Sequence, residues 1–190
     1  MHAPLLRHRS ARVLAVAALA ALACRLNLGG PDLPSGGPQA SDRTATEAAS
    51  AWEQALADAR TTGRLTIIVS EAQLTSSLAA RAASGDSWLR SPQVSLRDGE
   101  ILVYGVVRQD PFEANVRLSI APVVDAEGHL GFELGEADFG PLPASEGLRR
   151  NLSAMLSEVL AGPLGSLATG FRVTSVAVAD GELAIVAELR

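Results

Sequence analysis

One cysteine and a small group of carboxylates are the residues of this chain whose types and spacing could do chemistry. Cys24 is the only cysteine among 190 residues, and it directly follows Val13–Ala23, an apolar run of valine, leucine and alanine. Three arginines precede the run, so the order is that of a secretory signal: basic segment, short apolar segment and small residue at the cleavage point. Eleven apolar residues are too few to cross a bilayer core, which takes about 20 as a helix. We therefore expect residues 1–23 to be a signal peptide.

The cleavage point also resembles a known motif. Leu22-Ala23-Cys24 is similar to the lipobox of bacterial lipoproteins, although Ala21 stands where that motif most often has leucine. The resemblance implies that Cys24 is acylated, for example with palmitate, and becomes the mature N-terminus. It further implies an exported protein, lipid-anchored on the extracytoplasmic side of the cell membrane. The alternative is an ordinary signal peptide in which Cys24 has no role.

The remaining chemical groups do not favour an enzyme. After cleavage His129 is the only histidine, whereas a zinc site normally draws on several His or Cys ligands. No G-x-S-x-G, P-loop or dinucleotide-binding motif is present. Glu133, Glu136 and Asp138 are close enough in sequence for carboxylate catalysis or a calcium site, but such a triplet on a strand is more often a solvated face. We expect no catalytic residue, no metal and no cofactor.

The charge of the chain argues against partners that carry many negative charges. Without residues 1–23 the chain has 13 basic and 21 acidic residues, a formal charge of −8, and it contains no lysine. Such a surface argues against nucleic acid, because affinity for nucleic acid comes largely from cationic contacts to phosphate. It argues equally against electrostatic docking on anionic headgroups. A single cysteine also excludes an internal disulfide.

The first half of the mature chain reads as a tether followed by a helix, a strand and a second helix. Residues 24–43 combine the candidate lipidated cysteine with a Gly-, Pro- and Ser-rich stretch typical of a flexible linker. An alanine-rich helix is predicted from Thr44 to Thr61, with Trp52 on its apolar stripe. A short strand, Leu65–Val69, then runs into Ser70-Glu71-Ala72-Gln73, a capping box that opens a helix ending near Ala83.

A β-meander is predicted next. Asp98-Gly99 is a strong hairpin signal between the segments 94–97 and 100–108. Phe112–Ile120 alternates strictly between apolar and polar residues, which predicts one buried and one wet face. After a turn at 125–128 the chain returns through 129–139, where a change of phase predicts a bulge near Gly135.

A leucine-rich helix, Ser145–Ala161, and a second Asp-Gly hairpin, Phe171–Ala179 with Glu182–Leu189, complete the predicted elements. The two hairpins share a V-x-φ-x-D-G-E-φ-x-φ frame, where φ is apolar, and each follows a helix that begins with Ser-Glu. This pattern indicates either a weak repeat or two unrelated Asp-Gly hairpins. The predicted fold is α+β: a long curved antiparallel sheet, made of the meander and the second hairpin, packed on two to three amphipathic helices. Residues 44–190 form a single domain.

The segment Leu65–Arg190 resembles two bacterial envelope families, the YpmS-like and the LmeA-like proteins. The most specific feature is Gly140-Pro141-Leu142-Pro143 before the leucine-rich helix. The resemblance to the LmeA-like proteins implies phospholipid binding, whereas the YpmS-like proteins have no assigned function. Both resemblances imply a TULIP-like fold, in which a curved sheet wraps a helix and leaves an apolar groove. Neither resemblance brings a catalytic residue with it.

Three functions therefore compete. The first is a lipid-binding or lipid-handling lipoprotein that takes a phospholipid or fatty acyl chain. The second is a structural or protein-interaction module of the envelope without a small-molecule ligand, and the third is a hydrolase using His129 or the carboxylate triplet. For the first function we expect acyl chains between the leucine-rich helix and the apolar face of the meander. The residues predicted to contact them are Val116, Leu118, Phe132, Leu152, Met155 and Val159.

Overall fold

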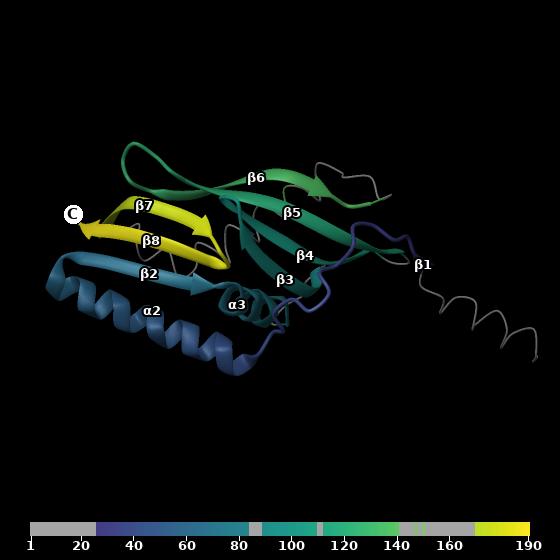
Figure 1. The fold of residues 1–190 in the computed structure, drawn as a ribbon, viewed down its shortest axis with the longest axis horizontal. Helices are drawn as coiled ribbons and strands as arrows, with labels where there is room; N and C mark the ends of the chain where they lie inside the picture. Colours follow the sequence, from purple (N-terminus) through teal and green to yellow (C-terminus); the bar gives the residue numbers. More distant parts are fainter. Residues whose placement is uncertain (1–25, 84–88, 110–111, 141–146, 148–149, 151–169) are drawn as a thin grey trace, which may run out of the picture.

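The computed structural model describes residues 26–83, 89–109, 112–140, 147, 150 and 170–190, and the statements below concern these residues. It shows an α+β fold in which two helices pack on two antiparallel sheets (Figure 1). This confirms the predicted fold class. The leucine-rich helix predicted at 145–161 lies almost wholly outside the described residues.

The larger sheet is built around one long strand. This strand, β5, pairs antiparallel with β4 on one side and with β6 on the other, and β4 pairs in turn with β3. A short strand, β1, runs parallel to the beginning of β5. The strands are β1 (Leu26–Asn27), β3 (Leu89–Arg97), β4 (Glu100–Gln109), β5 (Phe112–Val124) and β6 (Leu130–Asp138).

The alternation predicted for β5 is confirmed from Ala114 to Ile120, whereas Phe112, predicted on the same buried face, is exposed. Ala114, Val116, Leu118 and Ile120 are all at most 2% exposed, and the polar residues between them are mostly half-buried. The bulge predicted near Gly135 is confirmed as well, because Leu118 pairs with Ala137 while Ile120 pairs with Leu134, which leaves one extra residue in β6.

The smaller sheet contains β2 (Arg64–Ser70), β7 (Phe171–Ala179) and β8 (Glu182–Leu189). The second Asp-Gly hairpin has the predicted bounds, but it does not continue the meander. Its strand β8 pairs with β2 along all seven residues of that strand, so the hairpin forms a separate three-stranded sheet.

The two Asp-Gly turns meet at the junction of the sheets. In both turns the aspartate and the glycine have positive φ, 55° and 82° in the first and 52° and 82° in the second, as a type I′ turn requires. The turns exchange equivalent hydrogen bonds: Gly99 N donates to Val178 O (3.1 Å), and Gly181 N donates to Leu96 O (3.0 Å). The sequence repeat thus has a structural counterpart, in which matching positions of the two hairpins face each other.

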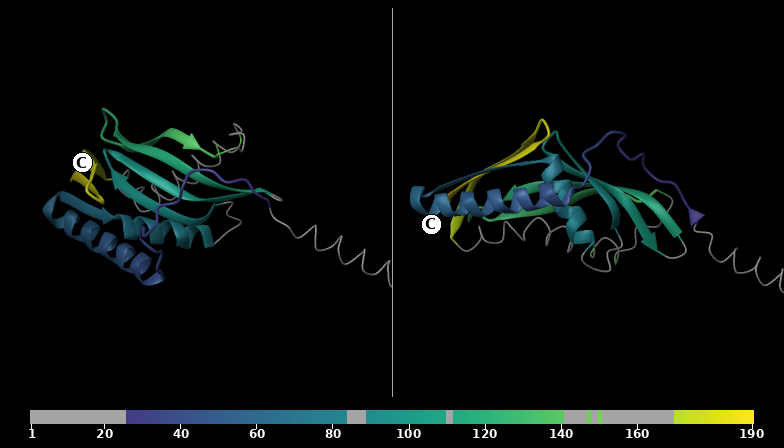
Figure 2. Two further views of the ribbon diagram at one scale, coloured as in Figure 1. Left: turned by 45° about the vertical axis from the view of Figure 1, so that its right-hand side comes forward. Right: turned by 90° about the horizontal axis from the view of Figure 1, so that it is seen from below.

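Local signals in the sequence explain both helices. Helix α2 (Asp42–Thr62) begins two residues before its predicted start because Ser41 is its N-cap, and it ends at Gly63, whose φ is 73°. Helix α3 (Glu71–Ala83) has the predicted capping box: Ser70 N donates to Gln73 Oε1 (2.9 Å), and Gln73 N donates to Ser70 Oγ (3.3 Å). α2 runs alongside β2, and α3 packs against α2 and β3 (Figure 2).

Two segments differ in detail from the sequence expectation. β3 begins at Leu89, before the segment predicted at 94–97, and Leu89 is completely buried. Residues 26–31, which belong to the segment predicted as a tether, hydrogen-bond along the beginning of β5.

Candidate functional site

An apolar cavity of about 330 Å³ lies between α2, the smaller sheet and the first turns of α3. Its volume is near the lower end of the range for small-molecule sites, about 300–1,000 Å³. The lining residues are Ala45, Ala48, Ala49, Ala51, Trp52, Glu53, Ala55, Ile67, Ile68, Val69, Gln73, Leu74, Ser77, Leu183 and Ile185.

The cavity exists because the helix that faces the sheet here carries very small side chains. Five alanines of α2 line it, opposite isoleucine, leucine and valine side chains of β2 and β8. A methyl group cannot fill the space that leucine would occupy in a close-packed interior, where voids larger than a water molecule are few. Trp52 is the only large apolar side chain that α2 contributes to the lining.

The chemistry of the lining favours an apolar ligand. Apart from the indole of Trp52, only Glu53, Gln73 and Ser77 bring polar side-chain atoms to it. The Gln73 side chain already accepts a hydrogen bond from the backbone of Ser70 in the capping box. The lining therefore presents hydrocarbon walls without an acid–base pair or a set of metal ligands.

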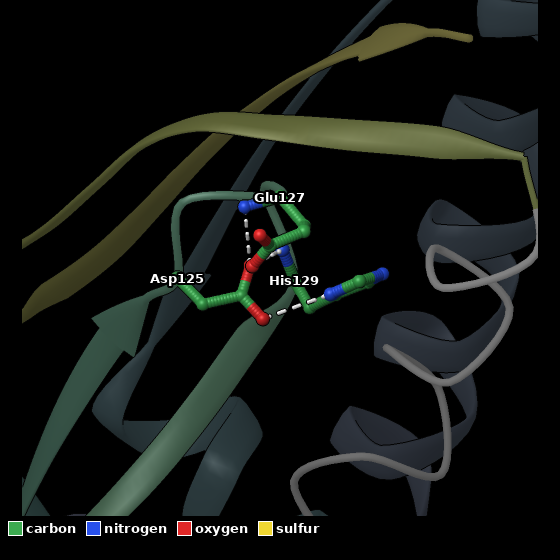
Figure 3. A group of neighbouring side chains, drawn as sticks. All are labelled: Asp125, Glu127 and His129. Carbon is green, nitrogen blue, oxygen red and sulfur yellow. Dashed lines mark hydrogen bonds and ion pairs between the residues drawn. The ribbon is translucent and has the colours of Figure 1, made fainter.

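A second group of side chains gathers in the turn between β5 and β6. Asp125 Oδ1 accepts hydrogen bonds from the backbone N–H groups of Glu127 (3.0 Å) and His129 (2.8 Å), and Asp125 Oδ2 lies 2.8 Å from His129 Nδ1 (Figure 3). The ligand atoms of the three residues lie within 4.8 Å of one another, and all three residues are exposed. The pKa of Asp125 is lowered, first by the hydrogen bond from the His129 backbone and then by the His129 side chain.

The same turn is held against the smaller sheet. Its backbone carbonyls accept three hydrogen bonds from β7 and the C-terminal residue: Ala126 O from Arg172 Nη2 (3.1 Å), Gly128 O from Val173 N (2.9 Å) and Glu127 O from Arg190 Nη2 (3.1 Å). The carboxylate of Asp125 holds the turn through hydrogen bonds within it, and the bonds from β7 and Arg190 hold the turn against the smaller sheet. This structural role accounts for the group without a bound ion.

The carboxylates singled out from the sequence have different surroundings. Glu136 lies 3.5 Å from the guanidinium of Arg117, and Asp138 accepts a hydrogen bond from Gly140 N (2.8 Å), while Glu133 is exposed. Among the described residues they are not grouped as a metal site.

A comparison with models of protein families shows which family the chain belongs to. The model of the LmeA-like phospholipid-binding family matches residues 41–188. The chain belongs to this family. The match covers both helices, the cavity and every described strand except β1, and it supports a lipid-binding domain. A search of curated proteins found no match.

Within this LmeA-like domain, the structure describes only some of the residues that were predicted to contact lipid. Val116 and Leu118 are completely buried, and Phe132 is partly buried against the same core. Leu152, Met155 and Val159, and also Cys24, lie outside the described residues. The groove predicted along the meander therefore stays a prediction.

The cavity beside α2 was not predicted from the sequence, although a signal was present. Trp52 was predicted on the apolar stripe of the helix, and the strand 65–69 that faces it was predicted as well. The missed signal is the run of alanines at and around Ala45, Ala48 and Ala49, where a helix that fills its contact with a sheet would carry larger side chains. In the described part of the chain, neither helix has the length and apolar character needed to cross a bilayer.

Proposed function

We propose that this protein is an exported lipoprotein, held at the membrane by acylated Cys24, whose LmeA-like domain binds phospholipid by enclosing an acyl chain in the cavity beside α2. The observation that carries the proposal is this cavity, because it offers hydrocarbon walls of ligand-binding size in a member of a phospholipid-binding family. The signal peptide and the lipobox-like Leu22-Ala23-Cys24 support the anchor.

The energetics suit a protein that exchanges lipid with a membrane. Burying one CH₂ group from water contributes about 0.8 kcal/mol, so an enclosed chain is held without any headgroup contact. A chain that leaves a bilayer for the cavity moves between two apolar environments, and the net free-energy change of that exchange is small. Binding should depend little on salt, because the formal charge of the whole chain is −5 and the lining offers no cation for a phosphate.

Filling the cavity tests the proposal. Ala48→Trp places an indole among the lining residues, whereas Ala57→Trp puts the same side chain on the exposed side of α2, outside the lining. We expect phospholipid to co-purify with the wild-type protein and with Ala57→Trp, as measured by native mass spectrometry, and to be lost from Ala48→Trp. A smaller replacement, Ala48→Leu, should reduce uptake of a fluorescent phospholipid while the thermal unfolding curve remains cooperative.

Equal lipid content in all variants would reject this cavity as the site and favour the groove predicted along the meander. Lipid-free wild-type protein would reject lipid binding and favour the envelope interaction module. The anchor has a separate test: Cys24→Ser should abolish incorporation of labelled palmitate and release the protein from the membrane fraction.

A further inference from the structure

The N-terminal segment is held on the larger sheet at one end of the molecule. β1 pairs with β5 in the register Leu26 to Phe112 and Asn27 to Glu113. The backbone continues this contact, because Leu28 N donates to Glu113 O (2.9 Å) and Asn115 N donates to Gly29 O (2.9 Å). We call residues 26–31 the strap.

The close approach of the strap to the sheet depends on glycine. Gly30 has a φ of 124°, and a Cβ atom at this position would overlap the carbonyl oxygen of Asn115. The side chain of Asn115 adds a hydrogen bond from Nδ2 to Pro31 O (3.2 Å). A Cβ on Gly140, just after β6, would come within 2.5 Å of the Cα of Gly30, so the strap also packs against the end of that strand.

The strap fixes the distance from the proposed anchor to the sheet. Only Arg25 lies between Cys24 and Leu26. Because an extended chain spans at most about 3.6 Å per residue, the Cα of Cys24 lies within roughly 7 Å of the Cα of Leu26. Acyl chains on Cys24 would therefore enter the bilayer close to this end of the sheet.

The surface at this end suits a bilayer interface. Phe112, at the beginning of β5, is one of three large hydrophobic side chains exposed among the described residues, with 37% of its surface accessible. Phenylalanine, like tryptophan and leucine, is typical of the apolar face by which interfacial elements lie on a bilayer. The charges beside it are balanced, because Arg108 and Glu113 lie 3.7 Å apart as an ion pair. Figure 1 shows β1 and the beginning of β5 at one tip of the molecule and the C-terminus at the other.

We propose that the end of the larger sheet formed by the strap and by Phe112 rests on the bilayer into which acylated Cys24 inserts. This inference rests on the anchor in the proposed function, and its occupant is the membrane surface. β5 then points away from the bilayer. Its 13 residues, at about 3.4 Å each, hold the turn that contains Ala126 roughly 40 Å above the membrane.

Site-specific fluorescence on the acylated protein in phosphatidylcholine vesicles tests this orientation. Acylation consumes the thiol of the only natural cysteine, so an introduced cysteine is the single free thiol for an NBD label. We expect nitroxide-labelled phosphatidylcholine to quench the label in Phe112→Cys and to leave the label in Ala126→Cys unchanged. Equal quenching at both positions, or none at position 112, would overturn the proposed docking.

Releasing the strap provides the matched comparison. Gly30→Ala introduces the overlap with Asn115, whereas Gly36→Ala changes a glycine with a similarly positive φ, 81°, that has open space around it. In the Phe112→Cys background, Gly30→Ala should lose the quenching and Gly36→Ala should keep it, with both proteins still cooperative in thermal unfolding. Retained quenching in Gly30→Ala would contradict a role for the strap.

Flotation of the same samples with the vesicles separates this inference from the proposed function. Protein that floats but shows no quenching at position 112 retains the anchor and refutes the docking. Protein that carries no acyl group and does not float refutes the anchor, and the docking with it.

Discussion

The side chain of Glu71 joins helix α3 to strand β3, and its removal should weaken this contact. At the start of α3, its Oε1 accepts hydrogen bonds from Leu96 N (2.7 Å) and Ser95 Oγ (3.0 Å), and its backbone N–H donates to Gly181 O (3.2 Å). Glu71→Ala removes both side-chain bonds and leaves the N–H of Leu96 without that acceptor in a partly buried place.

The expected magnitude follows from these bonds. A hydrogen bond to a charged group contributes about 1.5–3 kcal/mol, and a carboxylate in the first turn of a helix adds about 0.3–1 kcal/mol through the helix dipole. Glu71→Ala should therefore lower the free energy of unfolding by about 2–4 kcal/mol. For a chain of this size, each kcal/mol lowers Tm by roughly 2–4 °C. Glu71→Gln keeps a carbonyl oxygen as acceptor and loses only the charge, so its cost should be near 1 kcal/mol.

Urea unfolding followed by circular dichroism measures these differences, with Glu47→Ala as the control. Glu47 makes a single exposed ion pair with Arg43 (2.8 Å), and an exposed helical pair of this kind contributes only about 0.3–0.5 kcal/mol. If Glu71→Ala is no more destabilising than Glu47→Ala, the two hydrogen bonds do not couple α3 to β3 and the reasoning is wrong.

Three further predictions concern separate parts of the molecule. Gly105→Ala should lower the free energy of unfolding by about 1–3 kcal/mol, because its Cβ would come within 2.6 Å of Cδ1 of the buried Leu89; an unchanged urea midpoint would contradict this. Trp52→Phe removes a buried Nε1–H that has no hydrogen-bond partner among the described residues, so it should change the free energy of unfolding by less than about 1 kcal/mol despite the lost volume. A large loss would indicate a partner. In an NMR titration the carboxyl carbon of Asp125 should report a pKa below 3.8. His129→Ala should raise this pKa only in part, because the backbone N–H of residue 129 still donates to the carboxylate. The stability that the ionised Asp125 carboxylate contributes is present above its unfolded-state pKa and is lost as the pH falls through its folded-state pKa.

The features predictable from the sequence are those encoded within a few residues. The capping box of Ser70 and Gln73 needs positions i and i+3, each Asp-Gly turn needs two residues, and the face of β5 needs only the alternation from Ala114 to Ile120. The bulge in β6 was visible because one extra residue shifts the apolar phase. Such signals are local, so no knowledge of the rest of the fold is needed.

The features that were not predictable depend on which distant segments meet. No residue of Leu65–Val69 indicates that its partner is the last strand, and nothing in residues 26–31 apart from their glycines indicates pairing with β5. The cavity is harder still to predict from the sequence, because it depends on which side chains of α2 and the smaller sheet leave space between them. An alanine such as Ala48 has the same helix-forming character whether a leucine or a void lies opposite.

The pairing of β2 with β8 has a consequence for how the chain is made. Arg64 and Glu188, which form a cross-strand ion pair of 3.2 Å, are 124 residues apart, so β2 leaves the ribosome long before its only strand partner in the described structure. Contacts this distant in sequence form slowly, and an unpaired strand as apolar as Leu65–Val69 is prone to aggregation while it waits. For a chain expected to cross a membrane before folding, the same delay is useful. The smaller sheet cannot close until the C-terminal hairpin arrives, so in the proposed export this sheet would form only late in translocation.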